Sequence, residues 1–269
     1  MKSIKILLTC LALIVSAIFL TACTEKSNSK KLIVGMELSY PPFEMTDKEG
    51  KPAGISVELA KALARHLEKE LVIENLAFDG LIPSLKTGKI DLIISSMTIT
   101  EERQKTIDFS DPYSRAYLSL LLPKKSSLSN VQELNAKDKK IAVKKGTTGH
   151  IFAMKYLPQA SHLVLDKENA AVLEVVQGKA DAFIYDQMTI FNNWQKHPDT
   201  TRAILKPFQN DYEYWGIALR QGDTELKTTI NQFLQKFKQE GGFNKLAETY
   251  LPDIKKAFDE LNIPFFFSS

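Results

Sequence analysis

A phrase that occurs twice places the strongest constraint on how this chain can fold. Thr87–Ile94 (TGKIDLII) matches Gln177–Ile184 (QGKADAFI), and both copies follow a helical pattern of apolar residues. In each copy a glycine ends the helix, and the apolar run that follows predicts a buried strand. The openings of the two units also correspond, since Lys31–Val34 (KLIV) parallels Lys140–Val143 (KIAV). Two units of strand, helix and strand predict two α/β lobes of similar build.

Apolar residues at helical spacing predict further helices. Leu59, Leu63 and Leu67 recur every four residues behind Ser56, which we expect to cap that helix. We expect another helix over residues 81–88, with its proline near the start and its glycine at the end.

Two more helical patterns lie in the second half of the chain. Leu173 and Val176 supply the apolar pattern before the second copy of the phrase, and Asp223 or Thr224 is expected to cap a late helix. Residues 252–269 show a weaker amphipathic pattern with a tip of three phenylalanines. We expect that tip to pack against the body and assign it no role.

The N-terminus carries the signature of an exported lipoprotein. Lys2 and Lys5 precede a largely apolar run, Ile6–Leu20, which is shorter than the ~20 residues that cross a bilayer. The letters LTAC that end it resemble the bacterial lipobox, in which cleavage precedes the cysteine and diacylglycerol is attached to its sulfur. We therefore predict a signal peptide over residues 1–22 and lipidation of Cys23. A plain secretory peptide or an uncleaved anchor is the alternative.

This N-terminus determines the expected compartment and leaves no free thiol. Cleavage removes Cys10 and acylation occupies Cys23, so no cysteine remains for catalysis, metal binding or a disulfide. Residues 23–31 would form a polar lipidated tether, and several acyl chains hold a protein stably on a membrane. We expect an extracytoplasmic protein, in the periplasm or on the outer face of the plasma membrane.

Charge and motif content argue against several function classes. The formal net charge is +3, and the two lysines of the signal peptide account for most of it, so the body lacks the basic excess typical of nucleic-acid binding. The sequence holds no G-x-S-x-G, no Walker loop and no G-x-G-x-x-G. Its four histidines lack metal-ligand spacing. We expect no metal and no cofactor, and a binding protein rather than an enzyme.

A segment rich in hydroxyl groups, Ser95–Arg103, points to an anion site. It follows a predicted buried strand, and Thr100 stands where it would cap a helical turn that opens with two glutamates. Strand-end hydroxyls and amides beside a helix N-terminus attract anions, and Arg103 would add the planar fork that carboxylates prefer. The alternative is a capped surface helix with a solvated arginine.

Six short phrases carry a family resemblance through their order and spacing. They are Tyr40–Glu44 (YPPFE), Asp79–Leu85 (DGLIPSL), Met97–Arg103 (MTITEER), Asp108–Tyr113 (DFSDPY), Lys145–Gly149 (KGTTG) and Gly178–Ala182 (GKADA). Together they cover roughly residues 32–251. The chain resembles the family 3 substrate-binding proteins of polar amino-acid ABC transporters, which include the histidine-, lysine/arginine/ornithine- and glutamine-binding proteins.

The resemblance implies an α/β, two-lobed periplasmic-binding-protein (Venus flytrap) fold of type II, with two crossing hinge strands and the ligand in the cleft. The implied segments are 32–112 and 216–251 for a discontinuous lobe 1, 113–117 and 211–215 for the hinge strands, 118–210 for lobe 2, and 252–269 for a C-terminal extension.

The resemblance also implies a binding site for an amino-acid zwitterion. Arg103 would grip the α-carboxylate, with help from hydroxyl-bearing residues and backbone, and Asp186 of the other lobe would take the α-ammonium. Since an unpaired buried charge is costly, a ligand that pairs with both lobes favours the closed form. The implied ligand-binding set is Glu37, Tyr40, Phe78, Ser95, Ser96, Thr98, Arg103, Lys144, Thr147, Thr148 and Asp186.

Four members of this set would recognise the ligand side chain. Tyr40 and Phe78 would sandwich it, and Glu37 and Lys144 would face its tip. Each has a plainer alternative: the two rings could be core aromatics, the glutamate a loop acid and the lysine a solvated strand residue. Asp186 could likewise be only a strand-end cap.

The residues at the tip bear on which amino acid is bound. The family usually has aspartate where this chain has Glu37, and the glutamine binder has a lysine where this chain has Lys144. An amide tip could accept from Lys144 and donate to Glu37, which favours glutamine. Against this, Ser95–Ser96 and Gly146–Thr148 are more like the basic amino-acid binders. A basic amino acid is therefore the alternative, and cystine or an acidic amino acid stays open.

The leading hypothesis is a monomeric lipoprotein that captures a polar amino acid by cleft closure and delivers it to the membrane permease of an ABC importer. No nucleic-acid partner is expected. Two other classes stay open. One is a dehydratase-like enzyme on the same fold, in which a general acid would replace the ammonium partner. The other is a sensory or adhesive surface lipoprotein.

Overall fold

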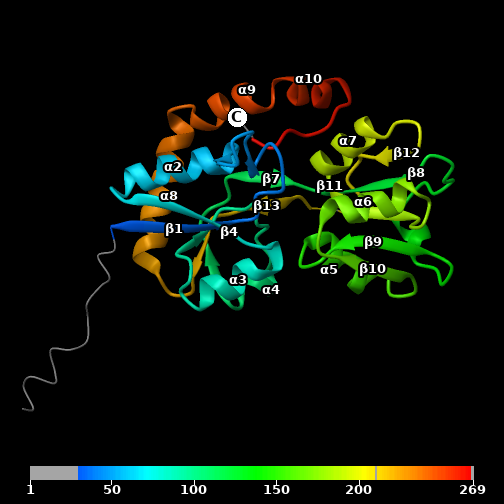
Figure 1. Ribbon diagram of the computed structural model, residues 1–269, viewed down its shortest axis with the longest axis horizontal. Coiled ribbons are helices and arrows are strands. Elements are labelled where there is room, and N and C mark those ends of the chain that lie inside the picture. The colour runs from blue at the N-terminus through cyan, green and yellow to red at the C-terminus, as the bar shows by residue number, and fades with distance from the viewer. Residues whose placement is uncertain (1–29, 210, 268–269) are drawn as a thin grey trace, which may run out of the picture. The chain divides into compact units, whose positions relative to one another are not determined.

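Two sheets, each with its own helices, make up the body of the protein. The computed structural model describes residues 30–209 and 211–267, so the predicted signal peptide, the lipidation site at Cys23 and nearly all of the tether lie outside the described residues. From Leu32 onward the chain forms one unit. Within this unit, two five-stranded sheets and the helices packed on them form two lobes, which we call lobe 1 and lobe 2 (Figure 1).

Lobe 1 is built around a mixed sheet. Its strands β1 and β5 run parallel, with Val34 opposite Leu92, and β14 runs antiparallel to both β5 and β6. The strand order is β4 (Glu70–Asn75), β1 (Lys31–Met36), β5 (Leu92–Ile93), β14 (Ala218–Arg220) and β6 (Ile107–Phe109). The helices of this lobe are α2 (Ile55–His66), α3 (Phe78–Lys86), α4 (Glu101–Gln104), α8 (Thr224–Gln239), α9 (Gly242–Tyr250) and α10 (Pro252–Glu260).

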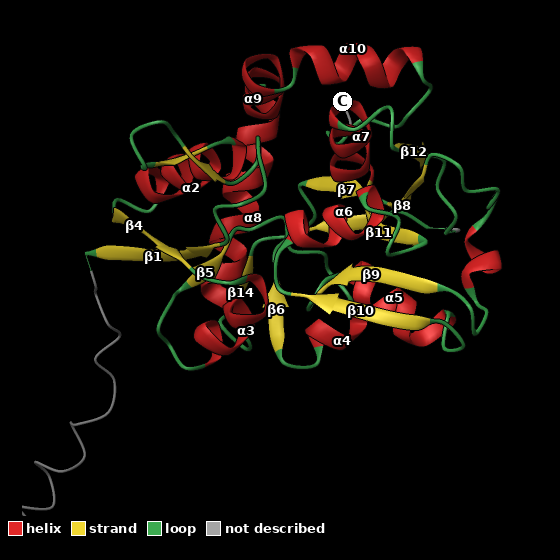
Figure 2. Ribbon diagram, turned by 45° about the vertical axis from the view of Figure 1, so that its right-hand side comes forward, coloured by secondary structure: helices red, strands yellow, loops and turns green. Residues whose placement is uncertain are grey.

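Lobe 2 repeats the parallel arrangement and extends it on one side with antiparallel strands. Strand β9 pairs in parallel with β10 and β11, and β8 runs antiparallel to β11 and β12. The strand order is β10 (Ser161–Leu165), β9 (Lys140–Lys144), β11 (Ala182–Asp186), β8 (Leu118–Pro123) and β12 (Thr201–Ile204). The helices are η1 (Val131–Leu134), α5 (Thr148–Tyr156), α6 (Glu168–Val176) and α7 (Gln187–Lys196). Figure 2 shows helices against the strands of both sheets.

A two-stranded ribbon runs between the sheets. Strands β7 (Ser114–Ala116) and β13 (Glu213–Trp215) pair antiparallel, with Ser114 opposite Trp215. They fall inside the two ranges that the resemblance implies as hinge strands. The boundaries given above for the lobes stay predictions. A second short ribbon, β2 (Met45–Thr46) with β3 (Pro52–Ala53), follows the Tyr40–Glu44 phrase.

Two expectations about helix starts are wrong. Ser56 does not cap α2, because the helix begins after Gly54 and the Ser56 hydroxyl instead donates to the carboxylate of Glu44 at 2.6 Å. Helix α3 begins at Phe78, ahead of the expected range, so its proline lies inside the helix. Both differences arise because the chain after β4 and after Glu44 packs against distant residues that local spacing does not reveal.

The other helix patterns are confirmed except at one residue. Thr100 caps α4 by accepting from the Arg103 N–H at 3.2 Å, and Asp223 caps α8 by accepting from the Leu226 N–H at 3.2 Å. In α6, however, Leu173 is 48% exposed. The buried residues of that helix are Ala171, Val172 and Val175.

The C-terminal tail is part of the core of lobe 1, which confirms the expected packing of its aromatic tip. Phe266 is fully buried, and its ring centroid lies 5.1 Å from that of Phe43 and 5.7 Å from that of Trp215. Its carbonyl accepts from the Arg115 N–H of β7 at 3.0 Å. Phe258 of α10 contacts the ring of Phe191 in α7 at 5.6 Å. The tail therefore supports strand β7 and also reaches helix α7 of lobe 2.

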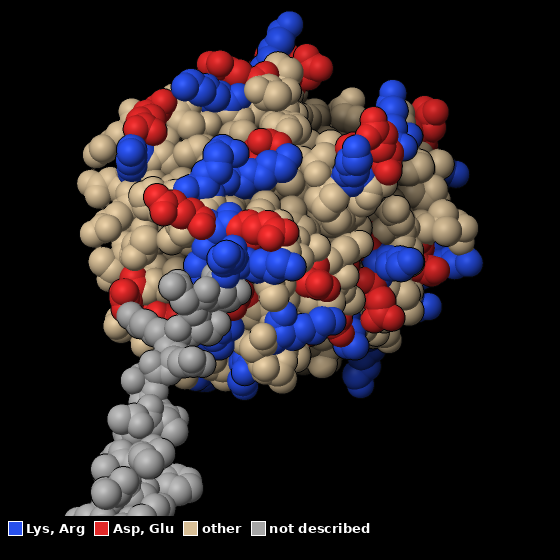
Figure 3. Space-filling model, turned by 60° about the vertical axis from the view of Figure 1, so that its left-hand side comes forward, with Lys and Arg blue, Asp and Glu red and all other residues tan. Residues whose placement is uncertain are grey.

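Charged side chains of both signs are interspersed on one face of the molecule (Figure 3). On the face in Figure 3, acidic and basic side chains alternate without an extended stripe of one sign. Within residues 30–209 and 211–267, no helix has the length and apolar content needed to span a bilayer.

Candidate functional site

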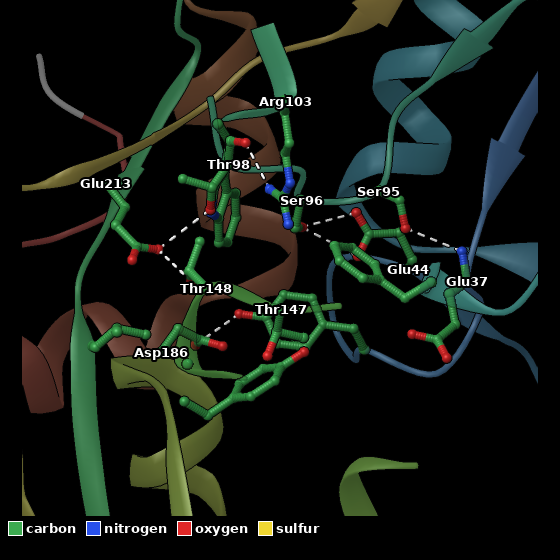
Figure 4. Close-up of a pocket in the computed structure, with 16 residues that line it drawn as sticks. Glu37, Glu44, Ser95, Ser96, Thr98, Arg103, Thr147, Thr148, Asp186 and Glu213 are labelled. Carbon is green, nitrogen blue, oxygen red and sulfur yellow. Dashed lines mark hydrogen bonds between the residues drawn. The ribbon is translucent and has the colours of Figure 1, made fainter. Parts of the chain in front are cut away.

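One cavity brings together side chains from both sheets and from the ribbon between them (Figure 4). Ten of the eleven residues expected to bind a ligand line it, namely Glu37, Tyr40, Phe78, Ser95, Ser96, Thr98, Arg103, Thr147, Thr148 and Asp186. The eleventh, Lys144, does not line the cavity itself. Its ammonium contacts the carboxylate of Glu37, which does. The residues predicted from the sequence therefore lie together in the structure. Their contacts with a ligand stay predictions.

Arg103 supplies the positive charge of the cavity from lobe 1. The Thr100 cap starts α4 one turn before it, and the guanidinium is only 6% exposed. Its Nη1 donates to the Thr98 carbonyl at 2.6 Å and its Nη2 to the Gly146 carbonyl at 3.1 Å. Burial lowers the pKa of Arg103 to about 10, so the group still carries its charge at neutral pH. The arginine is therefore fixed in orientation by residues of both lobes.

Asp186 supplies a negative charge from lobe 2. It ends β11 and caps α7, accepting from the Met188 N–H at 2.9 Å and the Thr189 N–H at 3.1 Å. The Tyr40 hydroxyl of lobe 1 donates to the same oxygen at 2.8 Å. The strand-end cap that was the plainer alternative is thus present, and the carboxylate also lines the cavity. Burial raises the pKa of Asp186.

Neither of these charged groups has an ion-pair partner. Among the residues that the structure describes, no acidic group lies within ion-pair distance of Arg103, and no basic group lies within that distance of Asp186. A buried charge without a counter-charge is costly, and it is retained where a ligand completes the pair. The cavity therefore presents a cation from lobe 1 and an anion from lobe 2, neither of which has an ion-pair partner among the described residues.

An ion pair closes the other end of the cavity. Lys144 is 2% exposed, and its ammonium contacts the carboxylate of Glu37, whose N–H donates to Ser95 Oγ at 3.0 Å. The solvated alternative for Lys144 is therefore wrong. Lys145, the residue after β9, is exposed and pairs with Asp79 at 2.7 Å.

Phe78 lies beside both cations. The guanidinium carbon of Arg103 and the Nζ of Lys144 each lie 5.6 Å from its ring centroid, which is within the range of cation–π attraction. Tyr40, the second aromatic of the expected pair, stacks on Phe43 at 5.3 Å. Both rings line the cavity and offer it apolar faces.

The loop before α5 brings hydroxyls and a tight backbone to the cavity. Thr147 caps α5 and donates to the Lys144 carbonyl at 2.7 Å. Gly149 must be a glycine, because a Cβ there would lie 2.4 Å from the Ile184 carbonyl oxygen of β11. This close approach sets the N-terminus of α5 against the end of β11, so Thr148 and Asp186 line the same cavity.

Two carboxylates at the cavity, one buried and one half-buried, were not expected from the sequence. Glu44 is fully buried and accepts from Ser56 Oγ at 2.6 Å and from Ser96 Oγ at 2.8 Å. Burial raises its pKa to about 8. Glu213 of β13 accepts from Thr98 and Thr148. Glu44 stood within a recognised phrase and Glu213 within an expected hinge strand, but nothing in the local sequence indicates that either points into the cleft.

Four more residues line the cavity without having been expected there. They are Leu118, Gly149, Tyr185 and Trp215. Ser96, which was expected, has a left-handed backbone with φ of 47°, an uncommon conformation for a residue with a Cβ. Such strain persists where surrounding contacts hold it and is frequent at binding sites. Here the Ser96 hydroxyl is turned toward Glu44 rather than free in the cavity.

Comparison with known proteins identifies the family. The model of the bacterial extracellular solute-binding proteins, family 3, matches residues 32–253. The chain belongs to this family. The L-arginine-binding protein of Pseudomonas aeruginosa is 31% identical over 229 residues, covering 82% of this chain and 88% of that protein. The ABC transporter glutamine-binding protein GlnH of Bacillus subtilis is 30% identical over 230 residues, covering 84% and 83%.

A solved structure confirms the fold of this family 3 protein. The ancestral amino acid-binding protein AncCDT-1, a precursor of cyclohexadienyl dehydratase, is 36% identical with a TM-score of 0.75, covering 82% of this chain and 95% of that one. The expected α/β, two-lobed binding-protein fold of type II is therefore confirmed. The chain is an extracellular solute-binding protein, as its family membership states.

Proposed function

We propose that this solute-binding protein captures a free polar α-amino acid in the cleft between its lobes and delivers it to the permease of an ABC importer. One observation carries the proposal: Arg103 and Asp186 are buried, lack ion-pair partners among the described residues, and face one cavity from opposite lobes. A zwitterion supplies both missing partners, with its carboxylate on Arg103 and its ammonium on Asp186. Binding to both lobes favours closure of the cleft.

A side chain with a neutral amide tip, as in glutamine, fits the far end best. The Lys144 ammonium and the Glu37 carboxylate are already paired. An amide oxygen can accept from Lys144 while its NH₂ donates to Glu37, and no charge is left uncompensated. A guanidinium would take Glu37 away from Lys144 and leave that buried lysine beside a second cation. The glutamine-binding relative from B. subtilis is consistent with this assignment.

A basic amino acid is the second candidate, because the cavity holds more carboxylates than cations. Glu44 lines it and has no basic partner within ion-pair distance among the described residues. A cationic side chain would provide that partner and promote ionisation of Glu44. The arginine-binding relative from P. aeruginosa agrees with this alternative. Cystine and acidic amino acids find no matching feature and enter only as test ligands.

Calorimetric titration of the chain from residue 24, unfolded and refolded to remove any carried ligand, tests the proposal. The ligands are glutamine, arginine, lysine, histidine, glutamate and cystine. We expect glutamine to bind tightest and Lys144→Ala to weaken it. Tight arginine or lysine binding that improves in Lys144→Ala and is lost in Glu37→Ala would favour the basic candidate. Binding of none of them by folded protein would contradict the proposal.

The non-enzymatic role, the anchor and the delivery step have separate tests. Turnover of a cyclic carboxylate such as prephenate would indicate a dehydratase instead of a binder. Incorporation of radiolabelled fatty acid, lost in Cys23→Ala, would support the lipid anchor that Cys23 implies. Loss of uptake of the bound amino acid after gene deletion would support delivery to an importer, whereas unchanged uptake would favour a sensory surface lipoprotein.

A further inference from the structure

The ribbon between the lobes carries a carboxylate that bridges the cleft. Glu213 of β13 places a single oxygen, Oε2, between two hydroxyls (Figure 4). Thr98 Oγ1 of lobe 1 donates to it at 3.3 Å, and Thr148 Oγ1 of lobe 2 donates to it at 2.8 Å. A threonine hydroxyl has one proton to donate. Both hydroxyl protons are therefore committed to Glu213 and are not free for another anion.

The charges around Glu213 match those that a ligand carboxylate needs. Arg103 attracts the Glu213 carboxyl, and this attraction partly offsets the rise in the pKa of Glu213 that burial causes. Asp186 of β11 opposes it as a like charge. Arg103 is the group that the proposed function assigns to the ligand α-carboxylate, and Thr98 and Thr148 line the same cavity.

We propose that Glu213 acts as a built-in carboxylate that occupies the α-carboxylate subsite of the empty cleft, holds the two lobes together there, and is displaced by the incoming amino acid. This inference rests on the proposed function for the identity of the ligand, but not for the bridge itself. Glu213 sets the affinity because the ligand carboxylate must replace it on Thr98 and Thr148 and overcome repulsion between two anions in one subsite.

Two consequences separate this role from a merely structural one. Neutralising Glu213 removes the competitor, so ligand binding becomes tighter, whereas structural damage would weaken it. The competition also depends on ionisation, since a protonated Glu213 does not repel a carboxylate. Burial raises the pKa of Glu213, so the difference between the wild type and a neutral variant is largest at alkaline pH and shrinks as pH falls. The ratio of the two affinities removes the pH dependence of groups that do not interact with Glu213, whereas Asp186, which repels Glu213, stays coupled to it.

The test compares Glu213→Gln with the wild type and with Glu248→Gln, which neutralises an exposed acid on α9. Amino-acid affinity is measured by calorimetry on the purified, processed protein between pH 5.5 and 8.5. We expect Glu213→Gln to bind at least tenfold tighter at pH 8.5, with a smaller difference at pH 5.5. Glu248→Gln should match the wild type throughout. Unchanged or weaker binding in Glu213→Gln would overturn the inference.

A second measurement needs no ligand. In small-angle X-ray scattering of the ligand-free protein, Glu213→Ala should increase the radius of gyration, because the bridge between Thr98 and Thr148 is lost, while Glu248→Ala should not. An unchanged radius of gyration would overturn the inference. If no amino acid binds any variant but Glu213→Ala still opens the cleft, the proposed function fails and the bridge stands. If amino acids bind all variants equally, the function stands and the inference fails.

Discussion

The two copies of the repeated phrase form nearly the same turn in the two lobes. Gly88 and Gly178 both adopt left-handed φ angles, of 76° and 69°. Asp91 then accepts from the Ile33 N–H at 3.0 Å, and Asp181 accepts from the Lys140 N–H at 2.8 Å, so each aspartate ties its strand to the parallel neighbour. The repeated sequence therefore forms the same turn and the same aspartate contact in both lobes.

The two lobes differ beyond the ends of strands β5 and β11, where the cavity lies. After β5, lobe 1 continues through a strained Ser96 to a buried cation, Arg103. At the end of β11, lobe 2 presents a buried anion, Asp186. The same supersecondary unit thus carries opposite charge into the cleft from its two sides. This difference indicates that the repeated turn stabilises the fold of each lobe, whereas the residues after the strand determine what each lobe can bind.

Removing the cation of lobe 1 is expected to have the largest effect. Arg103→Gln should weaken amino-acid binding by about a thousandfold (roughly 4 kcal/mol), because the ligand carboxylate would be buried without its partner. Calorimetry measures the loss. Lys105→Gln, a nearby exposed cation, is the matched control and should bind normally. Retained affinity in Arg103→Gln would mean that the carboxylate is held elsewhere.

Removing the anion of lobe 2 is expected to have the next largest effect. Asp186→Asn keeps an oxygen that can accept from the Met188 and Thr189 N–H groups and from Tyr40, so the helix cap survives. Binding should weaken by about a hundredfold (roughly 2.7 kcal/mol), since the ammonium loses its counter-charge. A 2-hydroxy analogue of the ligand, which lacks the ammonium, should be affected far less. An equal loss for both ligands would assign Asp186 to the fold alone.

Two carboxyl groups with strongly raised pKa values, Glu44 in lobe 1 and Glu168 in lobe 2, give a pH test of the comparison. Glu44 of lobe 1 has its pKa raised from 4.5 to about 8 by burial, and Glu168 of lobe 2 from 4.5 to about 7. Between pH 4.5 and these values the folded state binds a proton that the unfolded state has lost. The free energy of unfolding therefore falls as pH rises, by up to about 1.4 kcal/mol per pH unit for each group.

Denaturant titration at several pH values measures those slopes. Glu44→Gln should flatten the pH dependence of the free energy of unfolding up to pH 8, whereas Glu168→Gln should flatten it only up to pH 7. Between pH 7 and pH 8, therefore, only Glu44→Gln should change the slope, and this distinguishes the acid of lobe 1 from that of lobe 2. A wild-type slope that neither variant reduces would show that both acids are ionised in the folded protein.

Much of the fold and most of the cleft were predictable from sequence because their signals are local. The repeated turn needs a glycine, an aspartate and an apolar strand within a few positions, and Arg103 stands one turn after a recognisable cap.

The residues that escaped prediction depend on contacts between distant positions. Glu44 accepts from Ser96, and Glu213 accepts from Thr98 and Thr148, so each role exists only once separate segments meet. The wrong cap at Ser56 has the same origin, because its hydroxyl is taken by Glu44. Long-range hydrogen bonds override local propensity in these cases.

The smallest expected effect tests whether the two turns are equivalent. A Cβ at Gly88 or at Gly178 would meet no atom within 4 Å, so Gly→Ala at either site changes only the cost of a left-handed backbone. Each variant should lower the free energy of unfolding by about 1 kcal/mol, measured by denaturant titration, with ligand affinity unchanged. Gly88→Asn and Gly178→Asn are the controls and should cost less, because asparagine tolerates this conformation. If only one of the two Gly→Ala variants lost stability, the turn in the other lobe would have to adjust its backbone to the new side chain. The repeated phrase would then be needed for the fold of only one lobe.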